Sequence, residues 1–229
     1  MKIGYQTREQ IEKIGEISLK LVCLENLDQT IDEIFTYLQT TGSEQTLEEL
    51  CPYFGVIWPS ARALAMALEG LPPAQLRDRK VLEIGCGLGL PSLVAAHLEA
   101  QVTATDFHPD VETFIRRNIY INNVLNITYS RVNWEIDQPT LGLYDWVIGS
   151  DILYEQKYPE QVSQVVSRHL KPGGQVLLAD PGRPYLQNFV DAMSRQGFSS
   201  ETQILRVPHL TGSSQGQEVF LLRFDRRLN

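Results

Sequence analysis

The feature that most constrains this chain is the run Val81-Leu82-Glu83-Ile84-Gly85-Cys86-Gly87-Leu88-Gly89. A short aliphatic segment, typical of a strand, leads straight into three glycines at alternate positions, and a helix pattern follows from Leu90 to Leu98. Because Gly85, Gly87 and Gly89 have no Cβ, the backbone there can turn sharply and approach a ligand closely. This order of strand, glycine turn and helix predicts one βα unit of a ligand-binding α/β fold.

The rest of the chain after Lys80 repeats this alternation. Strands are predicted at Val81 to Ile84, Val102 to Thr105, Ile127 to Val132, Trp146 to Gly149, Val176 to Ala179, Gln203 to Val207 and Glu218 to Phe224. Helices are predicted at Leu90 to Leu98, Pro109 to about Asn122, Pro159 to Leu170 and Tyr185 to Gln196. Such alternation predicts a parallel sheet covered by helices, with its ligand at the carboxyl ends of the strands.

The N-terminal part of the chain has a more mixed pattern. Ile17 to Leu24 could form a strand, and Leu27 to Leu38 places its apolar residues on one helical face. Ser60 is a suitable N-cap for an alanine-rich helix from Ala61 to Leu68, which Gly70 should end. We interpret this region as a lid or cap on the domain.

One carboxylate accompanies the glycine turn. Asp106 ends the next predicted strand, where a carboxylate can accept both ribose hydroxyls of an adenosine ligand. A dinucleotide turn usually has a third glycine at its sixth position, but this chain has Leu90 there. Glu83, two residues before the turn, would repel a pyrophosphate and suits a cationic ligand. Since S-adenosylmethionine carries a sulfonium and an amino group, the motif favours that cofactor over a nicotinamide.

Composition narrows the classes of partner and site. The net charge of −8 disfavours nucleic acid, whose binding depends on clustered Lys and Arg. The histidines and cysteines show no ligand spacing, so no metal site is predicted, and the three cysteines are interpreted as reduced thiols, Cys23, Cys51 and Cys86. Every apolar stretch is far shorter than the roughly 20 residues that cross a bilayer, and the first twenty residues lack a secretory signal pattern. We therefore expect a cytoplasmic protein without a membrane segment.

Four further segments carry a family resemblance that extends from Tyr53 to the C-terminus. They are Gly55-Val56-Ile57-Trp58-Pro59-Ser60, Asn133-Trp134, Ser150-Asp151-Ile152-Leu153-Tyr154 and Asp180-Pro181-Gly182-Arg183-Pro184-Tyr185-Leu186. With the glycine turn, the first three resemble the seven-strand, Rossmann-like class I methyltransferases, and within them methyltransferase family 16, which contains many protein-lysine methyltransferases. The fourth is similar to a segment of bacterial enzymes that methylate the electron-transfer flavoprotein β-subunit.

The resemblance implies a fold, a domain layout and a set of roles. The fold would be α/β, with a mostly parallel seven-stranded sheet, helices on both faces and an N-terminal extension. Residues 1–52 would be that extension, packed on a methyltransferase domain at 53–229. Asp151 and Tyr154 would face a protein substrate. The residues expected to bind S-adenosylmethionine are Trp58, Glu83, Gly85, Gly87, Gly89, Asp106, Asn133, Trp134 and Ser150.

Alternatives remain at this stage. A small-molecule or nucleic-acid methyltransferase could use the same fold, although adenine-amino enzymes carry prolines after the fourth strand and Ser150 to Tyr154 has none. A non-catalytic binding module and a nicotinamide oxidoreductase are rivals of other classes. Among single residues, Trp146 is expected to be a core aromatic and His108 a surface loop residue. Arg183 could clamp a carboxylate or simply pair at the surface.

Overall fold

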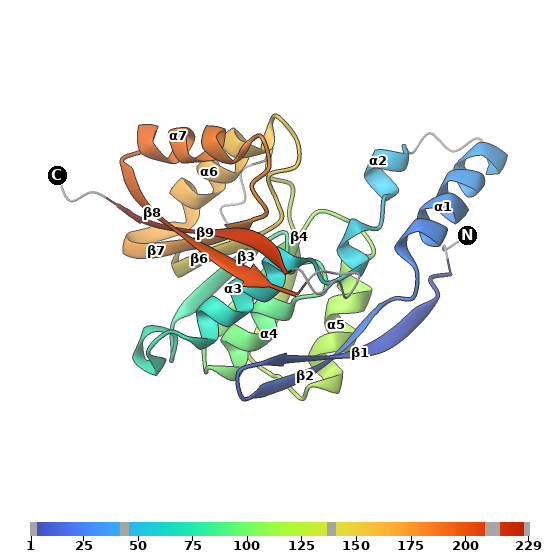
Figure 1. Cartoon of the computed structure of the whole chain (residues 1–229), viewed down its shortest axis with the longest axis horizontal. Coiled ribbons are helices and arrows are strands. Elements are labelled where there is room, and N and C mark those ends of the chain that lie inside the picture. The colour runs from blue at the N-terminus through green and yellow to red at the C-terminus, as the bar shows by residue number, and fades with distance from the viewer. Residues whose placement is uncertain (1–3, 42–45, 137–140, 209–215, 227–229) are drawn as a thin grey trace.

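A seven-stranded sheet forms the centre of the molecule, with helices on both faces (Figure 1). The computed structural model describes residues 4–41, 46–136, 141–208 and 216–226. The strand order is β5-β4-β3-β6-β7-β9-β8, and β9 alone runs antiparallel to its neighbours. The strands are β3 (Lys80–Ile84), β4 (Gln101–Asp106), β5 (Ile127–Arg131), β6 (Tyr144–Ser150), β7 (Leu170–Asp180), β8 (Phe198–Val207) and β9 (Gln217–Arg226). The predicted mostly parallel α/β sheet is thus confirmed.

The helices divide between the two faces, and each face has its own hydrophobic core. One face carries α3 (Pro59–Glu69), α4 (Leu90–His97) and α5 (Val111–Ile121), and the other carries α6 (Tyr158–His169) and α7 (Leu186–Arg195). Successive strand residues point to opposite faces, so on β3 Val81 joins the first core and Leu82 the second. A strand buried on both faces explains the unbroken aliphatic run in the sequence.

An antiparallel hairpin precedes this sheet and packs against its first helical face. It consists of β1 (Thr7–Ile14) and the predicted strand β2 (Ile17–Leu24), and β2 packs against α4 and α5. Fully buried Asn118 of α5 accepts a hydrogen bond from the Val22 amide at 2.7 Å and donates to the Leu88 carbonyl at 3.0 Å. The hairpin is thereby linked to the helix and to the glycine turn.

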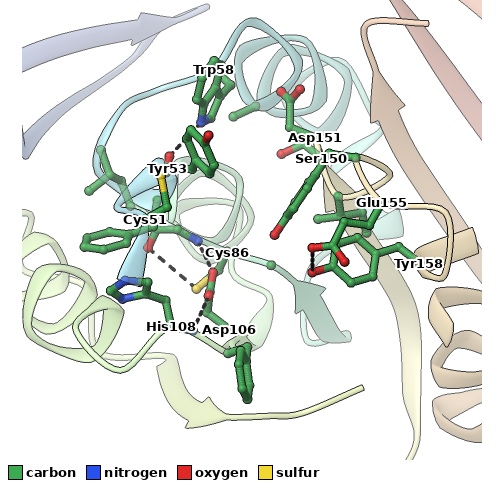
Figure 2. Close-up of a pocket in the computed structure, with 18 of the residues that line it drawn as sticks. Cys51, Tyr53, Trp58, Cys86, Asp106, His108, Ser150, Asp151, Glu155 and Tyr158 are labelled. Carbon is green, nitrogen blue, oxygen red and sulfur yellow. Dashed lines mark hydrogen bonds between the residues drawn. The ribbon is translucent and has the colours of Figure 1, made fainter. Parts of the chain in front are cut away.

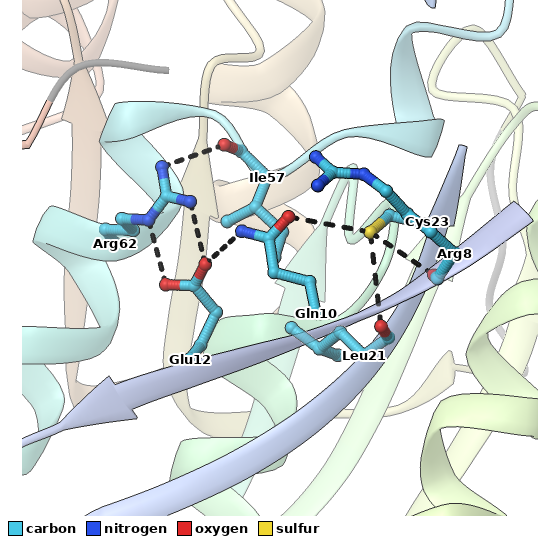
Figure 3. Close-up of polar contacts among 7 residues, drawn as sticks. All are labelled: Arg8, Gln10, Glu12, Leu21, Cys23, Ile57 and Arg62. Atoms are coloured by element: carbon cyan, nitrogen blue, oxygen red, sulfur yellow. Dashed lines mark hydrogen bonds and ion pairs between the residues drawn. The ribbon is translucent and has the colours of Figure 1, made fainter. Parts of the chain in front are cut away.

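A buried ion pair attaches the same hairpin to α3 (Figure 3). The Arg62 guanidinium donates to both carboxylate oxygens of Glu12 at 2.7 and 2.8 Å, and also to the Ile57 carbonyl at 3.1 Å. The two side chains are only 13% and 9% exposed. After the hairpin come α1 (Leu27–Thr41), α2 (Leu47–Leu50) and two short 3₁₀ turns, η1 (Tyr53–Gly55) and η2 (Pro73–Gln75).

Several predicted boundaries were wrong by a few residues. Ser60 is a buried residue inside α3, which begins at Pro59 with Trp58 at the N-cap position, because proline is well suited to the first helical turn. Helix α5 begins at Val111, with Asp110 at its N-cap, and not at Pro109. Strand β8 is mostly exposed, so its polar first half carried no strand signal. Within the described ranges, none of the helices combines the length and apolar character needed to cross a bilayer.

Candidate active site

One cavity of about 750 Å³ opens where β3, β4, β5 and β6 end (Figure 2). The predicted site residues that line it are Trp58, Gly85, Gly87, Gly89, Asp106, Asn133, Trp134, Ser150, Asp151 and Tyr154. They come from loops and strand ends far apart in the sequence, and they meet because parallel strands end at one edge of the sheet. Asp106 and Asp151 lie on different sides of this cavity.

The glycine turn is required by the protein's own packing as well as by its backbone conformation. Gly85, Gly87 and Gly89 all have positive φ, at 66°, 50° and 79°. A Cβ on Gly87 would lie 3.2 Å from the Phe54 carbonyl oxygen, and one on Gly89 would collide with the Ile115 side chain. Any other residue at these positions would therefore shift neighbouring elements even before a ligand is considered.

Asp106 is fixed beside this turn by two backbone donors. Its Oδ2 accepts the Gly87 N–H at 2.9 Å, and its Oδ1 accepts the His108 N–H at 3.0 Å. Burial raises the pKa of the Asp106 carboxyl, and these two hydrogen bonds oppose the rise. The carboxylate lines the cavity at the end of β4 with its orientation set by the loop.

Glu83 does not reach the cavity, which corrects the prediction that it contacts the cofactor. It is fully buried, is not among the lining residues, and accepts hydrogen bonds from the Ser92 N–H at 3.0 Å and from the Ser92 hydroxyl. Burial raises the pKa of Glu83 to about 8, opposed by the hydrogen bonds from Ser92. Strand alternation is the reason, because Glu83 shares the face of Val81, which packs toward α4.

Across the cavity, Asp151 follows the end of β6 in a conformation that non-glycine residues seldom adopt. Its φ is +58°, and its N–H donates to the Ala179 carbonyl at 3.0 Å. Its Oδ1 lies 2.8 Å from Arg183 Nη2, so Arg183 binds a carboxylate, which was one of its two predicted alternatives. Burial raises the pKa of Asp151, and Arg183 opposes the rise.

Aromatic rings form much of the wall around Asp151. The Tyr154 ring meets Tyr158 edge to face at 4.8 Å, and Tyr158 in turn meets Trp134 at 5.1 Å. On the opposite wall, Trp58 donates through Nε1 to the Tyr53 carbonyl at 2.8 Å. Tyr53 and Tyr154 are each 49% exposed, so these rings reach the mouth of the cavity.

Sequence reasoning missed several wall residues. His108, predicted to be a surface residue, is only 9% exposed, lines the cavity, and has its ring 4.5 Å from that of Phe54. Ile31 of α1 and Leu47 of α2 also line it, and only the folding of the N-terminal segment brings them there. By contrast Trp146 is a core residue as predicted, with its Nε1 donating to the Gln75 carbonyl at 3.0 Å. The described residues contain no cluster of three or more His, Cys, Asp or Glu that could hold a metal ion.

Known proteins resemble this chain over part of its length. A family model described as lysine methyltransferase matches residues 43–196. The chain is 35% identical over 130 residues to protein N-lysine methyltransferase METTL21A of Danio rerio, covering 54% of this chain and 58% of that protein. It is 30% identical over 150 residues to histone-arginine methyltransferase METTL23 of Xenopus laevis, covering 60% and 64%. The matched regions thus span less than two thirds of these relatives.

Solved structures share the fold at low sequence identity. A precorrin-6y C5,15-methyltransferase from Geobacter metallireducens matches with a TM-score of 0.61 at 19% identity, over 72% of this chain and 89% of that one. A 16S rRNA N2 G1207 methyltransferase of T. thermophilus matches with 0.63 at 16% identity, over 99% and 52%. Because the family model covers more than half of the residues, the chain belongs to the lysine methyltransferase family, methyltransferase family 16.

Proposed function

We propose that this protein transfers a methyl group from S-adenosylmethionine to the side-chain amine of a lysine in a protein substrate. The observation that carries the proposal is a single cavity that joins the glycine turn and Asp106 to Asp151 and Tyr154. Membership of the lysine methyltransferase family supports the choice of acceptor.

The residues of the cavity fit the proposed cofactor. Its volume is in the range of small-molecule sites, and the Asp106 carboxylate beside the turn suits two ribose hydroxyls. Trp134 offers an aromatic face for an adenine, and Asn133 lies beside it. The buried Nε1 of Trp134 has no hydrogen-bond partner among the described residues. Trp58 and Ser150 would complete the cofactor walls. When bound, S-adenosylmethionine supplies a methyl carbon that its sulfonium already activates.

The protein's part in the reaction is to position and desolvate the amine. A lysine must release its proton to solvent before its nitrogen attacks the methyl carbon, and because its ordinary pKa is about 10.4, removal of the amine from water favours the neutral form. The walls formed by Tyr53, Trp58 and Tyr154 would exclude water around the amine. Asp151 would accept a hydrogen bond from an N–H of the lysine amine and so align the nitrogen lone pair with the methyl group.

Labelling tests the acceptor. The protein is incubated with tritiated S-adenosylmethionine and a lysate from cells that lack it, and the labelled fraction is hydrolysed to amino acids. We expect label in protein, recovered as methyllysine. Recovery as methylarginine, or label confined to RNA or small molecules, would contradict the lysine proposal.

A substitution at Asp151 distinguishes the substrate side of the cavity from the cofactor side. Asp151→Asn should abolish transfer while the affinity for S-adenosylhomocysteine, measured by calorimetry, stays within about twofold, because Asp151 lies across the cavity from Asp106. Asp191→Asn, at an exposed position on α7, is the matched control and should leave both properties unchanged. Equal loss of cofactor affinity in Asp151→Asn would refute the substrate-side role.

We further propose that residues 1–52 form an extension on the domain at 53–229, and that the enzyme works in the cytoplasm. The packing of β2 against α4 and α5 supports the first part. The second is supported by Cys23, Cys51 and Cys86, which are free thiols, as is usual in a reducing compartment. Fractionation of cells that express a tagged chain tests the location.

A further inference from the structure

Arg183 lies between two carboxylates at the ends of neighbouring strands. Asp180, the last residue of β7, is fully buried, and its Oδ1 accepts the N–H groups of Gly182 at 2.8 Å and of Arg183 at 2.7 Å. Its Oδ2 lies 3.2 Å from Arg183 Nη1. Asp180 is therefore fixed by the backbone of the loop, and it holds the guanidinium from one side.

The other side of the guanidinium holds Asp151. Arg183 Nη2 lies 2.8 Å from Asp151 Oδ1, and the Asp151 side chain is only 10% exposed. Asp151 Oδ2 is also buried, yet it has no hydrogen-bond partner within the described part of the chain. A non-glycine residue at φ +58° persists only where its surroundings hold it, and it is often found at functional sites.

We propose that Arg183 is a positioning residue for the methyl transfer, bridging Asp180 to Asp151 so that Asp151 stays ionised, with one oxygen anchored and the other left for the substrate amine. This inference rests on the proposed function. Arg183 does not line the cavity, so it acts through Asp151 and not on the reacting atoms.

The charges around Asp151 explain why a cation is needed there. Burial and the charge of Asp180 raise the pKa of Asp151, while the charge of Arg183 is the main influence that opposes the rise. Ser60 Oγ and Asp151 Oδ2 have no partner at hydrogen-bond geometry among the described residues, so Arg183 is the group that anchors the carboxylate. Without it, two buried carboxylates would face each other with no counter-ion, and one would take up a proton.

The test measures the protonation of Asp151 directly. In protein carrying ¹³C-labelled aspartate carboxyls, the Asp151 signal is assigned by its absence in Asp151→Asn and followed against pH. Arg183→Gln should raise the pKa of Asp151 by about one to three units, since loss of an adjacent arginine has this effect. Arg183→Lys keeps the positive charge but loses the two guanidinium nitrogens that contact both carboxylates, so it should raise the pKa of Asp151 less. Arg206 is an exposed residue on β8 that pairs with Glu218 on β9, and Arg206→Gln should leave the pKa of Asp151 unchanged.

Activity provides the second measurement. Transfer of tritiated methyl groups to lysate protein should fall at least tenfold in Arg183→Gln near neutral pH and recover as the pH rises, with partial rescue in Arg183→Lys and unchanged affinity for S-adenosylhomocysteine. An unchanged Asp151 titration in folded Arg183→Gln would overturn the proposal, and so would failure of both Arg183 variants to fold. The titration needs no turnover. A wild-type protein that labels nothing would therefore refute the proposed function, and the titration would still show whether Arg183 keeps Asp151 ionised.

Discussion

At the scale of single residues, the structure gives different surroundings to two carboxylates, one just before the glycine turn and one at the end of the next strand. Asp106 faces the cavity, whereas Glu83 is buried behind it against Ser92. Both have a raised pKa through burial, yet only Asp106 is placed to contact a ligand. The carboxylate of Asp106 thus belongs to the candidate site, whereas that of Glu83 binds the start of helix α4.

Asp106→Asn is expected to weaken cofactor binding. The loss of hydrogen bonds to a charged acceptor costs about 1.5–3 kcal/mol, which is roughly a 10- to 150-fold rise in Kd for S-adenosylhomocysteine by calorimetry. Asparagine keeps an acceptor for one of the two backbone donors, so the loop should survive. Unchanged affinity would exclude a ribose contact by Asp106.

Glu83→Gln is expected to remove a pH dependence of stability. A carboxyl whose pKa is raised to about 8 in the folded state binds a proton more readily there than in the unfolded chain. At acid pH the carboxyl is protonated in both states, so its ionisation does not change the free energy of unfolding. As the pH rises from about 4.5 toward 8 the unfolded chain loses its proton first, and the free energy of unfolding falls. Glutamine stays neutral and should be more stable than the wild type by on the order of 5 kcal/mol above pH 8.

Urea unfolding across this pH range provides the measurement. Glu201→Gln, at an exposed position on β8, is the control and should follow the wild-type curve. Parallel stability curves for Glu83→Gln and the wild type would mean that Glu83 is not protonated in the folded state.

At the scale of elements, the N-terminal hairpin is joined to the main domain by buried polar contacts as well as by apolar packing. Asn118 connects β2 to the carbonyl of Leu88 in the glycine turn, and the ion pair between Glu12 and Arg62 connects β1 to the start of α3. Because α3 follows Trp58 directly, the hairpin supports the segment that carries one wall of the cavity.

A double-mutant cycle on this ion pair should show strong coupling. Arg62→Met leaves Glu12 buried without its counter-ion and should lower the free energy of unfolding by about 3–5 kcal/mol. Adding Glu12→Gln should recover part of that loss, since no buried charge then remains. The exposed pair of Arg206 and Glu218 is the control, and its cycle should give about 0–1 kcal/mol. Additive losses at Arg62 and Glu12 would contradict the coupling.

At the scale of the whole molecule, the cavity depends on both the sheet and the N-terminal segment. The sheet supplies the strand ends, and the segment before β3 supplies Ile31, Leu47, Tyr53 and Trp58. A ligand that fills this cavity contacts parts of the chain that are separate in the unfolded state, so it should stabilise the fold as a unit.

S-adenosylhomocysteine should therefore raise the melting temperature. At a concentration about 100 times its Kd the ligand contributes about 2.7 kcal/mol, which corresponds to roughly 5–10 °C for a chain of this size. NAD at equal concentration should produce no shift, and Asp106→Asn should reduce the shift caused by S-adenosylhomocysteine. Protection by NAD alone would favour the rival oxidoreductase and contradict the methyltransferase proposal.

The sequence by itself determined the βα alternation, the glycine turn and the carboxylate at the end of the next strand. These are local patterns, since hydrophobic periodicity, glycine spacing and a residue's place after a strand need no knowledge of distant contacts. Because parallel strands end at one edge, the same patterns also predicted Trp134 and Asp151 at the ligand-binding edge of the sheet, where both line the same cavity as Gly87.

Only the tertiary structure decided which way Glu83 faces, that His108 is buried, and that Arg183 bridges two carboxylates. The burial of His108 depends on the distant Phe54 ring, and the bridge made by Arg183 depends on Asp151 at the end of β6. The orientation of Glu83 depends on which face of β3 the following helix α4 covers. Burial and pairing arise when such distant segments pack together, and for that reason no local pattern could specify them.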